Sequence, residues 1–362
     1  MSIMSKKILF VTMHLPSVSV PEAGQKLAYS RLCSLSEKNN AKDIDLIAIY
    51  NEREESYINL ADYQRLNSTN LLKITNVRRL INFLSNFYLP INIAAKTDSR
   101  IKSLVKCKEY DYIHIEFEQG ISNIPVELWS KCNLVLHDVL SQSLYRFYIR
   151  EKSFLKKIIY YFRYKQMISW ERKVFNRAGE ITVLNDKDKD IVKTIINWKN
   201  VRINVDYPKV SGVFHDVNRN NVTLNNIIFW GAMNRKENID AVFWFLNEIF
   251  PLIIKKIPDS TFYIVGANPP EEIVQMQSEK ILVTGFVESP IPFFEKAALS
   301  VVPLRFGAGI KLKVLETLTA KIPTLATDVG AEGIDNINGC LFVENEPEKF
   351  AAQAVKILES RS

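Results

Sequence analysis

The residues best suited to chemistry lie in the stretch GAGIKLKVLE, residues 307–316. The apolar spacing that follows the glycines predicts a helix that begins near Ile310 and ends near Ala320. The free N–H groups and the positive dipole end of such a helix can bind a diphosphate. Gly307 and Gly309 would let the backbone approach this anion closely, where a Cβ would intrude.

Three side chains of the same stretch have charges that suit a nucleotide. Lys311 and Lys313 offer positive charge to a leaving diphosphate, and the Glu316 carboxylate can accept hydrogen bonds from ribose hydroxyls. Short glycine motifs are weak evidence by themselves. The alternative interpretation is a glycine-rich turn before an amphipathic helix whose lysines are simply solvated.

Short apolar runs alternate with helical patterns along the whole chain, which is typical of parallel α/β units. In the first half, strands are predicted at KILFVTM, DIDLIAIY, YDYIHIEF, CNLVLHDV and AGEITVLN. The pattern restarts in the second half with NNIIFWGA, DSTFYIVGAN, EKILVTGFV, ALSVVPLR, IPTLATDV and NGCLFVEN. A chain of 362 residues usually folds as two domains. A polar stretch at residues 203–223 separates the halves, and we expect domains at residues 1–208 and 209–362.

The stretch Val301–Ile334 resembles the donor-binding core of the family 4 glycosyltransferases (glycosyl transferases group 1). Further family-like phrases follow in the expected order across residues 225–355, and the first half matches more loosely. The resemblance implies the GT-B fold, in which two Rossmann-like doubly wound domains face each other across a cleft. It also implies that the C-terminal domain binds a nucleotide-sugar donor, that Glu316 contacts the donor ribose, and that the N-terminal domain serves the acceptor.

Two positions depart from the family pattern. The family places two glutamates eight residues apart, and counting back eight from Glu316 gives Ala308. The carboxylate that contacts the transferred sugar in the family is therefore missing, which leaves the donor sugar open. Relatives often have an arginine directly after the glycine of WGAMNRKEN, whereas here Ala232 follows Gly231 and Arg235 comes slightly later. Arg235 can still reach the phosphates from this loop; an exposed basic turn is the alternative.

Three further residues are assigned to the binding of the donor or the acceptor. Gly266 ends a predicted strand, where doubly wound domains bind ligands. Phe286 follows another strand, at a turn that lies against the nucleobase in the family, although core packing is the commoner role of a phenylalanine. Gly24 lies between the first strand and its helix, where the family has a glycine-rich loop near the donor phosphates and the acceptor.

The run HIEFEQ supplies the candidate catalytic residues of the first half. Strand alternation predicts that His114, Glu116 and Glu118 lie on one face of the strand. Glu116 occupies a position where relatives often carry a histidine, and we expect it to hold the transferred sugar or the acceptor hydroxyl. His137 closes the next strand beside Asp138 and is a second candidate catalytic residue; a structural role is the alternative for each histidine.

The predicted function is retaining transfer of a sugar from a nucleotide-sugar donor to a saccharide or lipid-linked saccharide acceptor. Bacterial surface polysaccharide biosynthesis is the usual setting of such relatives. The leaving diphosphate would be stabilised by the helix start and by Lys313 rather than by a catalytic triad. No cofactor and no required metal ion are expected, because the DKDKD run at residues 186–190 starts a helix. A non-catalytic nucleotide-sugar-binding scaffold and a sugar-nucleotide epimerase of the same fold are the alternatives.

The positive charge of the chain is concentrated in its first half. Residues 1–200 carry a net charge of +10 and residues 201–362 carry −3, and ten basic against two acidic residues lie in Leu144–Arg177. The aromatic residues interleaved there are typical of an interfacial helix on anionic lipid, although two solvated amphipathic helices are the alternative. No nucleic-acid-binding motif accompanies them. No apolar run reaches the roughly 18 residues of a membrane span. A cytoplasmic protein, with peripheral contact to the inner face of the plasma membrane as a hypothesis, is expected.

Overall fold

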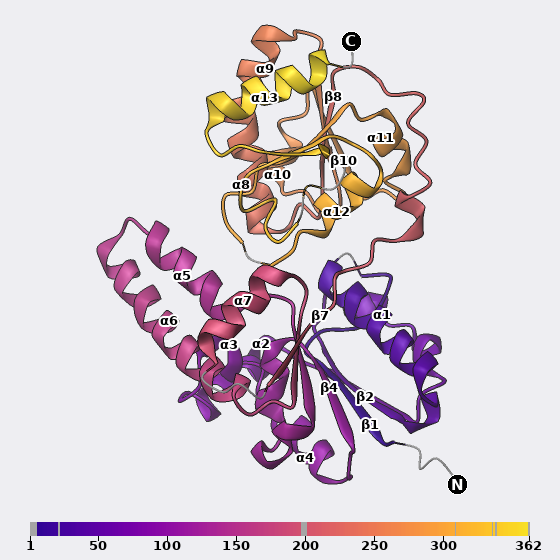
Figure 1. Ribbon diagram of the computed structural model, residues 1–362, viewed down its shortest axis with the longest axis vertical. Coiled ribbons are helices and arrows are strands. Elements are labelled where there is room, and N and C mark those ends of the chain that lie inside the picture. Colours follow the sequence, from indigo (N-terminus) through magenta and orange to yellow (C-terminus); the bar gives the residue numbers. More distant parts are fainter. Residues whose placement is uncertain are drawn as a thin grey trace. The chain divides into compact units, whose positions relative to one another are not determined.

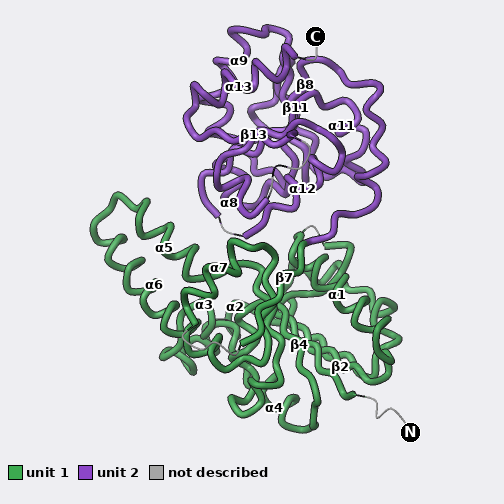
Figure 2. Tube along the Cα trace, in the orientation of Figure 1, with its two compact units in different colours: residues 1–207 green, residues 208–362 purple. Residues whose placement is uncertain are grey.

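The chain forms two compact units, each built on a parallel sheet (Figure 1). The computed structural model describes residues 6–20, 22–196, 201–307, 309–334, 336 and 339–360. Unit 1 is residues 1–207 and unit 2 is residues 208–362 (Figure 2). The division lies one residue before the boundary expected from the sequence.

Unit 1 contains a seven-stranded parallel sheet with the strand order β3-β2-β1-β4-β5-β6-β7. Its strands are β1 (Ile8–Thr12), β2 (Ile44–Tyr50), β3 (Ser68–Lys73), β4 (Tyr112–Glu116), β5 (Cys132–Leu136), β6 (Glu180–Val183) and β7 (Arg202–Val205). Its helices are α1 (Ala23–Lys38), α2 (Asn76–Ser85), α3 (Ile91–Ala94), α4 (Ser99–Lys106), α5 (Leu140–Arg150), α6 (Phe154–Phe175) and α7 (Asp186–Ile195). The two edge strands, β3 and β7, are additional to the five strands predicted from the apolar runs.

The central strands of unit 1 are buried on both faces, which explains their continuous apolar runs. Leu9 and Val11 of β1 contribute to one hydrophobic core, whereas Ile8 and Phe10 contribute to a second core on the opposite face. This alternation is the period of two that a strand imposes on its side chains.

Unit 2 contains a six-stranded parallel sheet with the strand order β10-β9-β8-β11-β12-β13. Its strands are β8 (Asn226–Trp230), β9 (Thr261–Val265), β10 (Ile281–Gly285), β11 (Leu299–Val302), β12 (Thr324–Ala326) and β13 (Leu341–Val343). Its helices are α8 (Lys236–Trp244), α9 (Phe250–Lys256), α10 (Glu271–Val274), α11 (Ile291–Lys296), α12 (Leu312–Thr319) and α13 (Pro347–Glu359), and a π-helical segment, Phe245–Ile249, joins α8 to α9. All six strands coincide with the apolar runs of the sequence.

The strand orders locate the ligand-binding edge of each sheet. In unit 1 the chain order reverses between β1 and β4, and in unit 2 it reverses between β8 and β11. Doubly wound sheets bind ligands at the carboxyl ends of the strands that flank such a reversal. The residues that follow β1, β4, β8 and β11 are therefore those to examine for a site.

In the part of the chain that the structure describes, no helix is long and apolar enough to cross a membrane.

Candidate active site

The glycine turn of unit 2 follows β11 and leads into α12, at the point of strand reversal. Helix α12 begins at Leu312, two residues later than the sequence predicted, and Ile310 lies in the preceding loop. Gly307 has a φ of +122° and Gly309 a φ of +73°, values that side-chain-bearing residues rarely adopt. Ala308, the position of the missing family glutamate, lies outside the described residues.

Lys313 is held at this edge by a fixed set of contacts. Its Nζ donates a hydrogen bond to Oδ1 of Asn238 at 2.7 Å and lies 4.4 Å from the centroid of the Phe229 ring. Asn238 is buried at the start of α8 and donates from Nδ2 to the backbone carbonyl of Ala232 at 2.7 Å. A Cβ at Gly231 would lie 2.7 Å from Nζ of Lys313. The lysine thus lies directly against the loop that follows β8.

The environment of Lys313 lowers the pKa of its ammonium group. Burial, followed by the positive charge of Arg235, lowers the pKa of Lys313 to about 7. Glu237 and Glu316 act in the opposite direction but do not offset these effects. A bound diphosphate would supply the negative charge that this site lacks.

Glu316 lies one turn after Lys313 on α12 and is half-buried. Its Oε2 accepts a hydrogen bond from the indole Nε1–H of Trp230, the last residue of β8, at 2.8 Å. Lys311, the N-cap residue of α12, donates from Nζ to the carbonyl of Gly309 at 2.6 Å and lies 3.9 Å from the buried Glu332. The turn residues and the α12 side chains thus form one connected group.

The main-chain floor of the site in unit 2 is the backbone of the two loops that follow β8 and β9. Gly231 (φ +152°) donates its N–H to the carbonyl of Val265, and Met233 donates to the carbonyl of Ala267. A Cβ at Gly266 (φ +148°) would lie 1.9 Å from the carbonyl oxygen of Gly231, so the two loops touch without any side chain between them. Both predicted glycines therefore mark a close approach of backbone to backbone.

Two other predicted residues of unit 2 lie at the surface. Arg235 is 53% exposed and forms an ion pair with Glu237 at 2.6 Å, next to the start of α8. Phe286, which follows β10, is 75% exposed and is not a core residue. Neither side chain joins the group around Lys313, although the charge of Arg235 acts on the pKa of Lys313.

In unit 1, Glu116 ends β4 and is completely buried. Its Oε1 accepts a hydrogen bond from Nε2 of His114 at 2.8 Å, and its Oε2 accepts one from Nε2 of His137 at 2.6 Å. A guanidinium N–H of Arg31, from α1, lies 3.4 Å from the same Oε2. Burial alone would raise the pKa of Glu116, but the Arg31 charge and the histidine hydrogen bonds hold this pKa well below its usual range.

His137, predicted as a catalytic residue, lies beside Gly24 and Phe117. Its ring stacks on Phe117 with 4.0 Å between centroids, and a Cβ at Gly24 would lie 3.2 Å from its Nδ1. Nε2 of His137 is engaged by Glu116, so Nδ1 is the ring nitrogen that faces Gly24. The structure therefore brings together Gly24, Glu116 and His137, which lie far apart in the sequence.

One expectation for this region is wrong. Glu118 does not share a face with His114 and Glu116, because Phe117 has a φ of +70° and the strand ends there. The Glu118 side chain is buried near Glu171 of α6 instead, and burial together with the Glu171 charge raises its pKa well above the usual value. Burial also raises the pKa of Glu171 to about 7.

The sequence analysis overlooked a second polar group at the same edge. His14, just after β1, contacts Oε1 of Glu54 through Nδ1 at 3.2 Å and accepts from Nζ of Lys96 through Nε2 at 2.8 Å. Burial and the Lys96 charge lower the pKa of His14 to about 4, and burial with the Arg79 charge lowers that of Lys96 to about 8. These residues line a pocket of about 230 Å³, counted with the solvent at its mouth. In the sequence, the feature that could have identified His14 is its position just after the first strand.

The acidic run at residues 186–190 forms the start of α7, as predicted. Asn185 is the N-cap residue and accepts a hydrogen bond from the N–H of Asp188. Among the described residues, no group of three or more histidine, cysteine, aspartate or glutamate side chains is arranged to hold a metal ion.

Comparisons with known proteins bear on both units. Residues 225–360 match the family described as glycosyl transferases group 1. An uncharacterised 44.6 kDa protein in the cps region of Klebsiella pneumoniae is 24% identical over 330 residues, which cover 86% of this chain and 81% of that protein. WaaG, a glycosyltransferase involved in lipopolysaccharide biosynthesis, has a similar structure with a TM-score of 0.62 at 14% identity, covering 97% of this chain and 90% of WaaG. Anabaena Alr3699/HepE, solved with UDP-glucose, gives a TM-score of 0.58 at 12% identity over 98% of this chain and 90% of that one.

Residues 225–360, which make up most of unit 2, are therefore similar to the glycosyl transferases group 1. The two parallel α/β units and their similarity to the solved glycosyltransferases define the GT-B fold, and the predicted fold class is confirmed.

Proposed function

We propose that the protein is a retaining glycosyltransferase of family 4 that moves a sugar from a nucleotide-sugar donor to a saccharide or lipid-linked saccharide. The observation that carries this proposal is the arrangement of Lys313, Asn238 and Gly231 at the strand reversal of unit 2. A half-buried lysine with a lowered pKa, placed against a glycine loop at the start of a helix, suits a diphosphate. The UDP-glucose bound by Alr3699/HepE supports a nucleotide-sugar donor.

The donor diphosphate would lie at the start of α12, where Lys313 and Lys311 neutralise its charge. Glu316 would accept hydrogen bonds from the ribose. In the transfer step, a bond forms between the acceptor oxygen and the anomeric carbon as the bond from that carbon to the diphosphate oxygen breaks. The acceptor proton passes to the departing diphosphate. The protein contributes positioning and charge stabilisation, and this mechanism requires no cofactor and no metal ion.

In unit 1 we assign Glu116 to positioning rather than to direct contact with a sugar. Both of its oxygens already accept hydrogen bonds, and its side chain is completely buried. Its carboxylate fixes the tautomer of His137, whose Nδ1 can then accept a hydrogen bond from an acceptor hydroxyl. Gly24 leaves the space beside this nitrogen open to a ligand.

The biological setting follows from the relatives. One of them is encoded in a cps region, and WaaG is involved in lipopolysaccharide biosynthesis. We infer that this protein acts in the assembly of a bacterial surface polysaccharide, in the cytoplasm, where nucleotide sugars are made.

A thermal-shift panel tests the donor site. Purified protein is melted with UDP, GDP, dTDP or CMP, and the panel is repeated with Glu316→Ala and Lys313→Ala. Lys349→Ala, on an exposed position of α13, is the matched control. A ligand at ~100 times its dissociation constant stabilises by about 2.7 kcal/mol, which corresponds to roughly 5–10 °C for a unit of this size. Each variant is compared with its own ligand-free melt.

One nucleotide should stabilise the wild type and Lys349→Ala, and this shift should be lost in both site variants. Absence of any shift with all four nucleotides contradicts the donor site. Incubation of the labelled nucleotide sugar with saccharide acceptors then separates transfer from epimerisation, because an epimerase changes the donor sugar in the absence of an acceptor.

A further inference from the structure

Helix α2 has its apolar side exposed and its polar side buried. Val77, Leu80, Ile81 and Leu84 recur at helical spacing and are between 47% and 69% exposed. The buried residue of this helix is the polar Asn82. A surface helix normally presents the opposite arrangement, with its apolar stripe toward the core.

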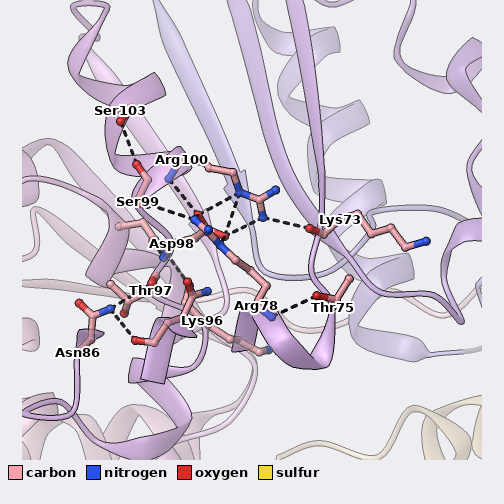
Figure 3. A network of polar contacts seen from close by, with 12 residues as sticks. Lys73, Thr75, Arg78, Asn86, Lys96, Thr97, Asp98, Ser99, Arg100 and Ser103 are labelled. Carbon is pink, nitrogen blue, oxygen red and sulfur yellow. Dashed lines mark hydrogen bonds and ion pairs between the residues drawn. The ribbon is translucent and has the colours of Figure 1, made fainter. Parts of the chain in front are cut away.

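The polar side of α2 is fixed to the rest of unit 1 by a network of hydrogen bonds and ion pairs (Figure 3). Thr75 caps the helix by accepting from the backbone N–H of Arg78 at 3.1 Å, and the Arg78 guanidinium donates to the buried Asp98 at 3.0 Å. Asn82 donates to the carbonyl of Ala95. Hydrogen bonds from Arg100 and Arg78 outweigh the effect of burial and hold the pKa of Asp98 well below its usual range. The outward apolar face is thus a fixed feature of the fold.

The apolar surface continues beyond α2. Phe87, Tyr88 and Ile91, in the segment that leads into α3, are 72%, 65% and 46% exposed. Arg163 of α6 lies 3.4 Å from the side-chain oxygen of Asn92, at α3, which places α6 next to this segment.

The α5–α6 hairpin adds a second set of exposed apolar residues. Figure 1 shows the loop end of this hairpin extending away from the sheet of unit 1. The first half of α6 exposes four large side chains by 56% to 74%, namely Phe154, Leu155, Ile159 and Phe162. The tyrosines between the two helices pack against one another with tilted rings, so the aromatic side chains of residues 144–177 divide between packing inside the hairpin and exposure.

The hairpin part of this surface is strongly basic, with ten basic and two acidic residues in residues 144–177. Residues 76–96 add three basic residues and no acidic one, although Arg78 is paired with Asp98 and Lys96 contacts His14. Lys157 and Lys165 lie over the rings of Tyr148 and Tyr161. Two such surfaces would repel each other, so a second copy of the chain is a poor partner. Exposed apolar side chains flanked by cations match the interface of an anionic bilayer.

We propose that unit 1 docks on an anionic lipid bilayer through a lipid-docking surface formed by residues 76–92 and by the α5–α6 hairpin, residues 144–165. This goes beyond the transferase reaction and does not depend on the nucleotide. Arg79, on the flank of α2, also lines the polar pocket of His14, Glu54 and Lys96. The bilayer therefore lies one helix diameter, ~10 Å, from that pocket, which brings a lipid-linked acceptor within reach.

Vesicle co-sedimentation tests the docking surface. Full-length protein is mixed with vesicles of phosphatidylcholine alone or with about a third phosphatidylglycerol, at low salt and at 0.5 M NaCl. The variants are Leu80→Glu/Leu84→Glu on α2 and Phe154→Glu/Leu155→Glu on the hairpin. Leu224→Glu, which charges an exposed leucine of unit 2, is the matched control. Melting temperatures and nucleotide shifts are recorded for every variant, and all five altered side chains are exposed, so folding should be retained.

The wild type and Leu224→Glu should sediment with the anionic vesicles, and high salt should weaken this binding. Each double variant should lower the apparent affinity for anionic vesicles at least about tenfold. It removes apolar area that the bilayer would bury, and it adds negative charge that the anionic lipid repels. Binding by either double variant equal to that of the wild type refutes the joint surface. A wild-type dimer that Leu80→Glu/Leu84→Glu converts to a monomer, without any vesicle binding, would instead assign this face to a second copy of the chain and overturn the proposal.

Discussion

Raising the pH from 7 to 9 should weaken the binding of the nucleoside diphosphate selected by the thermal-shift panel by about 50-fold, because Lys313 must be protonated to pair with a diphosphate. Burial and the Arg235 charge lower the pKa of this lysine to about 7 in the ligand-free protein. About half of the molecules then carry the ammonium at pH 7 and roughly 1% at pH 9, a difference of about 2.3 kcal/mol in the cost of protonation. A nucleoside diphosphate keeps its full charge over this range, since the second pKa of a phosphate is near 6.

The sign of this pH dependence follows from the linkage between proton binding and diphosphate binding. A bound diphosphate raises the pKa of Lys313, so binding takes up a proton above pH 7 and the affinity falls with increasing pH. Isothermal titration at pH 7, 8 and 9 measures the dissociation constant directly. Lys313→Arg keeps its charge at every pH used and should give a nearly flat profile. Lys313→Met should bind weakly and without a slope. A wild-type affinity that does not change between pH 7 and 9, or an equal slope in Lys313→Arg, would refute the reasoning.

Two carboxyl groups of unit 1 should respond in opposite directions to replacement by glutamine. Glu116→Gln should lower the free energy of unfolding at pH 7 by roughly 1–3 kcal/mol, because the hydrogen bonds from His114 and His137 lose their charged acceptor, whereas Arg31 keeps its ion pair with Asp206 at 2.7 Å. The pKa of Glu116 is depressed, so this contribution is present above about pH 4.5 and is lost at lower pH, where the urea denaturation curves of wild type and variant should converge. Equal urea midpoints at pH 7 would argue against it. Glu171→Gln should stabilise unit 1 at pH 8 by at most about 3 kcal/mol: the pKa of Glu171 is raised from 4.5 to about 7, and wild-type stability falls as the pH rises through this interval. Melting curves from pH 4.5 to 8 measure this loss, and a wild type without it would contradict the prediction.

The fold was predictable wherever a strand forms a continuous apolar run. The six strands of unit 2 and the five inner strands of unit 1 form apolar runs that a sequence shows directly. The edge strands β3 and β7 are only partly buried, and their residues, STNLLK and RINV, mix polar and apolar types. An edge strand needs one apolar face at most, so the pattern of β3 and β7 resembles that of a loop, whereas the edge strands β10 and β13 of unit 2 keep the apolar runs ILVTG and LFV.

Site residues were predictable where they lie together in a local sequence motif. They were not predictable where they meet only through long-range contacts. Lys313 and Glu316 lie in a recognisable turn and helix. The link from His14 to Glu54 and Lys96 joins residues that are 40 and 82 positions apart, which no local spacing indicates. The predicted position of Glu118 was wrong because the alternating pattern was continued past Glu116. The positive φ of Phe117 ends the strand before Glu118.

The contact between Gly231 and Gly266 also determines which positions of unit 2 can tolerate substitution. No side chain fits at position 266, because even a Cβ would overlap a carbonyl oxygen, and a Cβ at position 231 would displace the lysine. At Gly285 a φ of +67° makes a side chain strained although a Cβ would meet no described atom within 4 Å beyond its own chain neighbours, whereas the adjacent Phe286 projects into solvent. Substitutions can accumulate after β10 while the main-chain floor stays unchanged. Under the proposed function, the choice of nucleotide can therefore diverge by point mutation at the loop after β10, while the glycine loops that we propose to bind the diphosphate stay intact.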